Sequence, residues 1–76
     1  MVKEINGVWY DTQTAKIDKQ FTFGKPGDAN GYEETLYITD KNDYFIYTNG
    51  GPQSKYTTEN ITPITREQVR DWVLSH

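Results

Sequence analysis

Two runs of β-branched and aromatic residues, Tyr32–Thr39 and Tyr44–Thr48, are separated by only the four residues Asp40–Asp43. A connection this short can join antiparallel neighbours, whereas parallel strands need a crossover of roughly a dozen residues or more. The sequence therefore predicts a β-hairpin at the centre of the fold. Successive side chains of a strand point to opposite faces, and aromatic rings fall on both faces here. We expect each face to contact either the core or a partner.

The residues after this hairpin predict a third antiparallel strand. Asn49-Gly50-Gly51 is followed by Pro52, and the run Gln53–Thr58 comes next. We interpret the glycines as a turn that uses positive φ angles, with Pro52 ending the ladder at the edge. The Walker phosphate loop has four residues between its glycines and then Lys-Ser or Lys-Thr. The adjacent glycines and the order Ser54-Lys55 do not fit it.

The N-terminal part of the chain is also rich in β signals. Asn6-Gly7 favours a tight hairpin turn, so Val2–Ile5 is predicted to pair with Val8–Tyr10. The segment Ala15–Phe23 is interpreted as a strand, with a short helical turn over Ala15–Phe21 as the alternative. The glycine-rich segment Gly24–Gly31 is interpreted as a loop.

The C-terminal segment predicts a helix. Thr65 followed three residues later by Gln68 matches a capping box. Val69, Trp72 and Val73 form one apolar stripe, and Trp72 is the expected anchor on the sheet. The predicted fold class is α+β: one domain over residues 1–76, with an antiparallel meander of four to five strands and one C-terminal helix packed on one face.

Composition limits the chemistry that is available. The chain has 76 residues, no cysteine and a single histidine, His76. Disulfides, thiolate zinc sites and a cysteine nucleophile are therefore excluded. We expect the terminal imidazole to be frayed and a poor ligand or general base. The core depends on two tryptophans, six tyrosines and three phenylalanines, and it is thin enough that a homodimer is a second expectation.

Charge and hydropathy patterns favour a soluble protein in the cytoplasm. The net charge is −3, with acids and bases mixed along the chain. No basic stretch suggests a nucleic-acid partner. No apolar segment is long enough for a signal peptide or a membrane span.

No arrangement of side chains indicates catalysis, a cofactor or a metal. On strands, Ser54 and Lys55 would point to opposite faces, and so would Glu33 and Glu34. The turn Asp40–Asp43 lacks the spacing, the central glycine and the closing glutamate of a calcium loop. We predict a protein that is not an enzyme.

Four tyrosines on neighbouring predicted strands are the remaining candidates for function. They allow three alternatives: packing at the core or its rim, a protein-binding surface, or stacking of single-stranded nucleic acid. The interleaved acids weaken the third alternative. The candidate partner-binding residues are Tyr37, Tyr44, Tyr47, Tyr56, Lys55, Glu33 and Asp43.

Four blocks of the sequence resemble a family of small, largely uncharacterised proteins of Firmicutes and their phages, plasmids and integrated elements. The blocks are Ile5–Ala15 (INGVWYDTQTA), Glu34–Thr39 (ETLYIT), Tyr44–Tyr56 (YFIYTNGGPQSKY) and Ile61–Trp72 (ITPITREQVRDW). They cover most of the chain except residues 16–33.

The chain departs from the family pattern at four positions. Ile46 and Ile64 replace leucine, Val69 replaces alanine, and Asp43 replaces a glycine of the hairpin turn. The first three keep an apolar side chain. The family pattern carries no catalytic residues.

The resemblance implies a context in which small acidic proteins often bind a host protein. Anti-CRISPR and other anti-defence inhibitors are one such class. We therefore expect a non-enzymatic binding module that inhibits a host defence protein by steric occlusion. A single-stranded nucleic-acid binder and a dimerising interaction domain are the alternatives.

Overall fold

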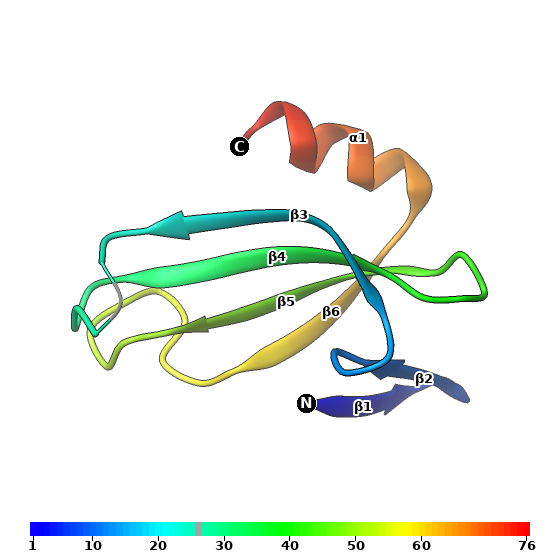
Figure 1. The fold of residues 1–76 in the computed structure, drawn as a ribbon, viewed down its shortest axis with the longest axis horizontal. Helices are drawn as coiled ribbons and strands as arrows, with labels where there is room; N and C mark the ends of the chain where they lie inside the picture. The colour runs from blue at the N-terminus through cyan, green and yellow to red at the C-terminus, as the bar shows by residue number, and fades with distance from the viewer. Residues whose placement is uncertain (26) are drawn as a thin grey trace.

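The computed structural model describes residues 1–25 and 27–76, and Pro26 of the predicted 24–31 loop lies outside the described residues. The fold is α+β, as predicted, but its strands form two sheets (Figure 1). The first sheet is the hairpin β1–β2, and the second is the meander β3-β4-β5-β6. The elements are β1 (Val2–Ile5), β2 (Val8–Asp11), β3 (Lys16–Phe23), β4 (Tyr32–Ile38), β5 (Tyr44–Gly50), β6 (Asn60–Ile64) and α1 (Arg66–Leu74).

The predicted N-terminal hairpin is confirmed. Asn6 and Gly7 have φ angles of 53° and 81°. Both angles are positive, as a type I′ turn requires. Ile5 pairs directly with Val8 across the turn. The turn is further held by the Gly7 backbone N–H, which donates to Glu4 Oε2 at 2.9 Å.

The central hairpin is confirmed as well. β4 and β5 pair antiparallel in a register that places Leu36 opposite Ile46. β3 pairs with the other edge of β4, with a register shift between Ile17 and Lys19. The first three strands of the meander, β3, β4 and β5, therefore pair in the predicted order.

The last strand is not where the sequence predicted it. Residues 51–59 lie between the strands, and β6 (Asn60–Ile64) pairs with β5 instead of Gln53–Thr58. The chain after β5 is bonded to the 24–31 loop: Gly51 N donates to Gly31 O at 2.9 Å, and Gln53 N to Ala29 O at 2.8 Å. These contacts hold the segment away from β5. Pro63 lies inside β6, at an outer edge of the sheet, where a missing N–H is tolerated.

The glycines after β5 serve a different purpose from the predicted one. Neither Gly50 nor Gly51 has a positive φ. A Cβ on Gly51 would lie 2.5 Å from Asp28 O, and one on Gly50 would lie 2.8 Å from Tyr32 Cβ. Gly50 is therefore required by the close approach of Tyr32 on the paired strand β4, and Gly51 by the close approach of the 24–31 loop. The turn pattern does not reveal this packing requirement.

In Figure 1, α1 lies beyond the β3 edge of the four-stranded sheet and the β1–β2 hairpin lies near β6. On the hairpin side, Tyr10, Phe45 and Ile61 form the core cluster. Tyr10 meets Phe45 edge to face, with ring centroids 5.5 Å apart. The cross-strand pair Leu36 and Ile46 is buried on the opposite face of the sheet, which is the helix side.

The helix begins as predicted and is only lightly buried. Gln68 N donates to Thr65 Oγ1 at 3.2 Å, and Thr65 N donates to Gln68 Oε1 at 2.8 Å. These two bonds complete the capping box. Trp72 is half-buried, and no residue of α1 is fully buried. No helix in the described part of the chain has the length and apolar character needed to cross a membrane.

Candidate functional site

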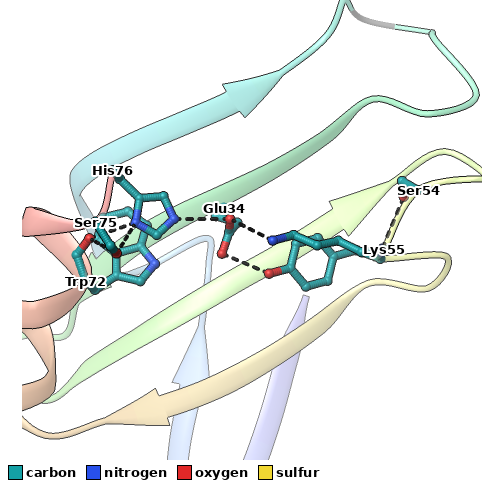
Figure 2. A network of polar contacts seen from close by, with 7 residues as sticks. Glu34, Ser54, Lys55, Trp72, Ser75 and His76 are labelled. Atoms are coloured by element: carbon teal, nitrogen blue, oxygen red, sulfur yellow. Dashed lines mark hydrogen bonds and ion pairs between the residues drawn. The ribbon is translucent and has the colours of Figure 1, made fainter.

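A buried carboxylate lies between the sheet and the helix. Glu34 is on β4, is 7% exposed and points to the helix side of the sheet (Figure 2). Tyr56 Oη donates to its Oε2 at 2.8 Å, while His76 Nε2 and Lys55 Nζ lie 3.1 and 3.8 Å from its Oε1. The carboxylate thus connects β4 with the 51–59 segment and with the end of the chain just after α1.

The partners of Glu34 decide its ionisation. Burial raises the pKa of the carboxyl group. The hydrogen bonds from Tyr56 and His76, together with the charges of His76 and Lys55, lower the pKa by more than burial raises it. Its pKa is therefore below the ordinary value. Burial and the hydrogen bond to Glu34 raise the pKa of Tyr56 to about 12. At neutral pH the pair is a carboxylate that accepts from a protonated phenol.

His76 is not frayed, which corrects the expectation from the sequence. Its side chain is only 13% exposed. The ring stacks on Trp72 at 4.1 Å between centroids and meets Phe21 edge to face at 4.9 Å. Its Nδ1 lies 2.7 Å from Trp72 O while Nε2 faces Glu34. The imidazole is thus fixed by two aromatic rings and two oxygens.

Ser75 contacts His76, and His76 contacts Glu34, as the serine, histidine and acid of a catalytic triad do. The geometry around Ser75 does not suit such a triad. Ser75 Oγ lies 3.1 Å from His76 Nδ1 and donates to Trp72 O at 2.9 Å. It caps the C-terminus of α1, where unpaired carbonyl oxygens carry partial negative charge. An oxyanion needs N–H donors at that position. This cluster therefore suits a structural connection between helix and sheet better than nucleophilic catalysis.

Aromatic rings continue the site beyond Glu34. Tyr32 meets Tyr56 edge to face at 5.4 Å and stacks on Phe23 at 5.2 Å. Lys55 Nζ lies 4.9 Å from the centroid of the Tyr32 ring and 5.3 Å from that of Tyr56.

A cavity of about 480 Å³ adjoins these groups. Glu34, Lys55, Tyr56 and Trp72 are among the residues that line it. Trp72 Nε1 is buried and has no hydrogen-bond partner within the described residues. The cavity thus combines a carboxylate, an ammonium group and aromatic rings.

Two of the predicted tyrosines lie on the hairpin side of the sheet. Tyr37 stacks on Phe45 at 5.0 Å, and burial together with the charge of Glu33 raises its pKa. Tyr47 donates to Glu59 Oε2 at 2.9 Å. Burial and that hydrogen bond raise the pKa of Tyr47 to about 12. Both are half-buried against the core, so packing explains their position.

The other predicted residues are distributed over several parts of the molecule. Tyr44 is half-buried and faces the helix side, and Tyr56 lies in the 51–59 segment instead of on a strand. Glu33 accepts from Thr35 Oγ1 at 3.0 Å on the hairpin side. Asp43 is half-buried in the turn between β4 and β5. Only Lys55 and Tyr56 are brought together with Glu34.

Sequence reasoning missed Glu34 and His76, although one signal pointed to the first. Glu34 shares a face of its strand with Leu36 and Ile38, and a carboxylate on an apolar face needs a buried partner. No pattern identified that partner as His76, because 42 positions separate the two residues.

Sequence reasoning also missed Trp9. Its side chain is 67% exposed, and Val2 on the neighbouring strand is 54% exposed. Cross-strand pairs share a side, so Val2 with Asp11 and Glu4 with Trp9 form the face of the hairpin that points away from the core. We call these four residues the hairpin outer surface. Alternation alone shows that Trp9 and Tyr10 point to opposite sides, but not which of them is buried.

Comparison with protein-family models, with curated proteins and with solved structures gave no match. The resemblance to the Firmicutes mobile-element family therefore stays a prediction. Within the described residues, no three histidine, aspartate or glutamate side chains group together as metal ligands.

Proposed function

We propose that this chain is a non-enzymatic protein-binding module whose contact surface is the hairpin outer surface. The observation that supports it is the exposure of Trp9, at 67%, on a hairpin whose opposite side is anchored in the core through Tyr10. Tryptophan is enriched among the residues that dominate binding energy in protein interfaces. A rigid hairpin presents such a ring without a large entropic cost.

The charges beside Trp9 indicate the kind of partner. Glu4 and Asp11 flank the ring on the same face of the hairpin. Complementary charge steers and aligns association, so the partner surface is expected to carry lysine or arginine around an apolar depression. With the predicted mobile-element context, the partner is a host protein and the mode of inhibition is steric occlusion. An interface of standard size needs about 800 Å² from this protein.

Affinity capture from a host lysate tests this function. The wild-type chain and Phe23→Ser are expected to retain one specific partner, and Trp9→Ser is expected to lose it. Phe23 is a matched control because its ring is also exposed, at 53%, but lies on β3. Recovery of no specific partner, or equal recovery with Trp9→Ser, contradicts the proposal.

The nucleic-acid alternative needs an open sheet face with stacked rings. Here the β1–β2 hairpin packs on Phe45 and Ile61 of one face, and His76 lies against Phe21 and Glu34 of the other. A gel shift with a polypyrimidine strand at low salt tests this alternative. Sedimentation over a range of protein concentrations tests the homodimer.

A further inference from the structure

Among the described residues, the carboxylate of Glu34 contacts two close donors and one more distant, exposed ammonium group. Tyr56 and His76 are fixed partners, at 2.8 and 3.1 Å. The third is Lys55, whose Nζ lies 3.8 Å away and whose side chain is 57% exposed. A direct hydrogen bond between an ammonium and a carboxylate is about 2.7–2.9 Å long. Lys55 is therefore a loosely held neighbour of this carboxylate.

Two aromatic rings form a corner around the Lys55 ammonium. Tyr32 and Tyr56 are inclined at 75° to each other, and Lys55 Nζ lies 4.9 and 5.3 Å from their centroids. Cations within about 6 Å of a ring centroid are attracted by the negative face of the ring. The corner and the carboxylate of Glu34 therefore attract the same cation.

The corner is held in place by the rest of the fold. Tyr32 is on β4 and stacks on Phe23. Tyr56 is fixed through its backbone N–H, which donates to Ser54 Oγ at 3.1 Å, and Ser54 Oγ in turn donates to Gly51 O at 2.8 Å. The two rings and the carboxylate are therefore preorganised, while the lysine side chain that occupies the corner is 57% exposed.

We propose that Glu34, Tyr32 and Tyr56 form a binding site for an alkylammonium group, which Lys55 occupies in this structure and leaves when the ligand binds. The incoming cation replaces the contacts that Lys55 gives up, the 3.8 Å approach to Glu34 and the contacts with the two rings, and this offsets the cost of displacing Lys55. A rounded cation fits a corner of two inclined rings, whereas a planar guanidinium favours one flat ring face. The cavity of about 480 Å³ beside Glu34 offers room for the remainder of the ligand.

This site is separate from the hairpin outer surface. The rings belong to β4 and the 51–59 segment, and Glu34 contacts His76 on the side of the sheet opposite the hairpin. Failure of the proposed function therefore leaves this inference unaffected, and the reverse also holds.

Titration with tetramethylammonium chloride, exchanged against sodium chloride at constant ionic strength and followed by NMR of the Tyr32 and Tyr56 ring protons, tests the site. Lys55→Ala removes the internal cation and is expected to bind tetramethylammonium about threefold more tightly than wild type, or better. Lys41→Ala makes the same change of charge in the exposed turn after β4 and is expected to match wild type. tert-Butanol, a neutral molecule of similar shape, is expected to give no saturable shift.

Two further variants locate the binding groups. Lys55→Ala combined with Glu34→Gln is expected to weaken binding at least about fivefold relative to Lys55→Ala, and Lys55→Ala combined with Tyr32→Leu to do the same. If the Glu34 variant fails to fold, the Tyr32 variant decides. Equal affinity of Lys55→Ala and Lys41→Ala, or saturation by tert-butanol, would overturn the proposal.

Choline and a trimethyllysine amide, titrated in the same way, distinguish the two sources of such a group. Saturation by choline at lower concentration assigns the site to a choline-type headgroup. The opposite order assigns it to a modified lysine side chain. Saturation by neither contradicts the proposal.

Discussion

Glu34 Oε1 lies 3.1 Å from His76 Nε2 across 42 positions of the chain, and this contact links the centre of the sheet to the end of the helix. α1 has no fully buried residue, so its attachment to the sheet depends on a few contacts near its C-terminal end. His76 meets the Phe21 ring of β3 edge to face and the Glu34 carboxylate of β4, and its ring stacks on Trp72 of α1 (Figure 2).

Glu34→Gln is expected to lower the free energy of unfolding by about 1.5–3 kcal/mol, because hydrogen bonds to a charged group are lost in a buried position. Denaturant unfolding measures this effect. Asp40→Asn is the control, since it removes a carboxylate from an exposed turn position. The control is expected to change stability by less than about 0.5 kcal/mol. A Glu34 variant as stable as the control would contradict a structural role for the contact between Glu34 and His76.

Acid is expected to weaken the fold through the same carboxylate. The pKa of Glu34 is lower in the folded state than its ordinary value of 4.5. Its contribution to stability is therefore fully present above the ordinary pKa and is lost as the pH falls through the lower folded-state pKa. Thermal unfolding at a series of acidic pH values measures this loss of stability. Stability should depend less steeply on acidic pH in Glu34→Gln than in wild type. An equally steep dependence in the variant would assign the acid sensitivity to other carboxyl groups.

Alkaline pH is expected to act through two tyrosines. The pKa values of Tyr47 and Tyr56 are each raised to about 12 from 10.0. Because a raised folded-state pKa favours the protonated form, their contribution is fully present below pH 10.0 and is lost as the pH rises through about 12. Tyrosinate absorbance during a pH titration should show a late component that decreases in Tyr47→Phe and in Tyr56→Phe.

Gly51→Ala is expected to destabilise the protein by about 1–3 kcal/mol, because overpacking forces a backbone shift. The new Cβ would lie 2.5 Å from Asp28 O and would also meet the carbonyl oxygen of Ala29. Gln53→Ala in the same segment removes only an exposed side chain and serves as the control. Denaturant midpoints compare the two variants, and equal midpoints would show that the loops can separate without cost.

Trp9 and Tyr10 are expected to respond in opposite ways to truncation. Tyr10 is 8% exposed and packs against Phe45. Tyr10→Ala should therefore cost about 3–5 kcal/mol, as the loss of a buried ring does. The Trp9 ring points to solvent, so Trp9→Ser should change stability by less than about 0.5 kcal/mol. Thermal denaturation distinguishes the two, and a large loss in Trp9→Ser would assign Trp9 to structure and remove its role in the proposed function.

The features that the sequence predicted correctly depend on residues close together in the chain. Asn6-Gly7 favours one turn geometry through its backbone preferences, and Thr65 with Gln68 satisfies N–H groups of the same helical turn. The central hairpin follows from a connection too short for any other pairing. In each case the decisive interaction spans only a few residues.

The errors concern contacts between distant segments. A strand was predicted at Gln53–Thr58, but the strand that pairs with β5 is Asn60–Ile64. Backbone hydrogen bonds from residues 51 and 53 to the 24–31 loop hold the intervening segment away from β5. His76 is fixed instead of frayed because Phe21, Glu34 and Trp72 converge on it. The candidate tyrosines lie on both faces of the sheet and in a loop, so they form no single surface.

The sequence by itself determined the α+β class, the two hairpin turns and the start of the helix, because local backbone preferences and short connections decide those features. Tertiary structure alone decided which face of each strand is buried, why two adjacent glycines are needed, and that Glu34 meets Tyr56, Lys55 and His76. Those outcomes depend on which segments approach one another in space. Side-chain alternation gives two equivalent choices for each strand, and only packing against the other layers selects one.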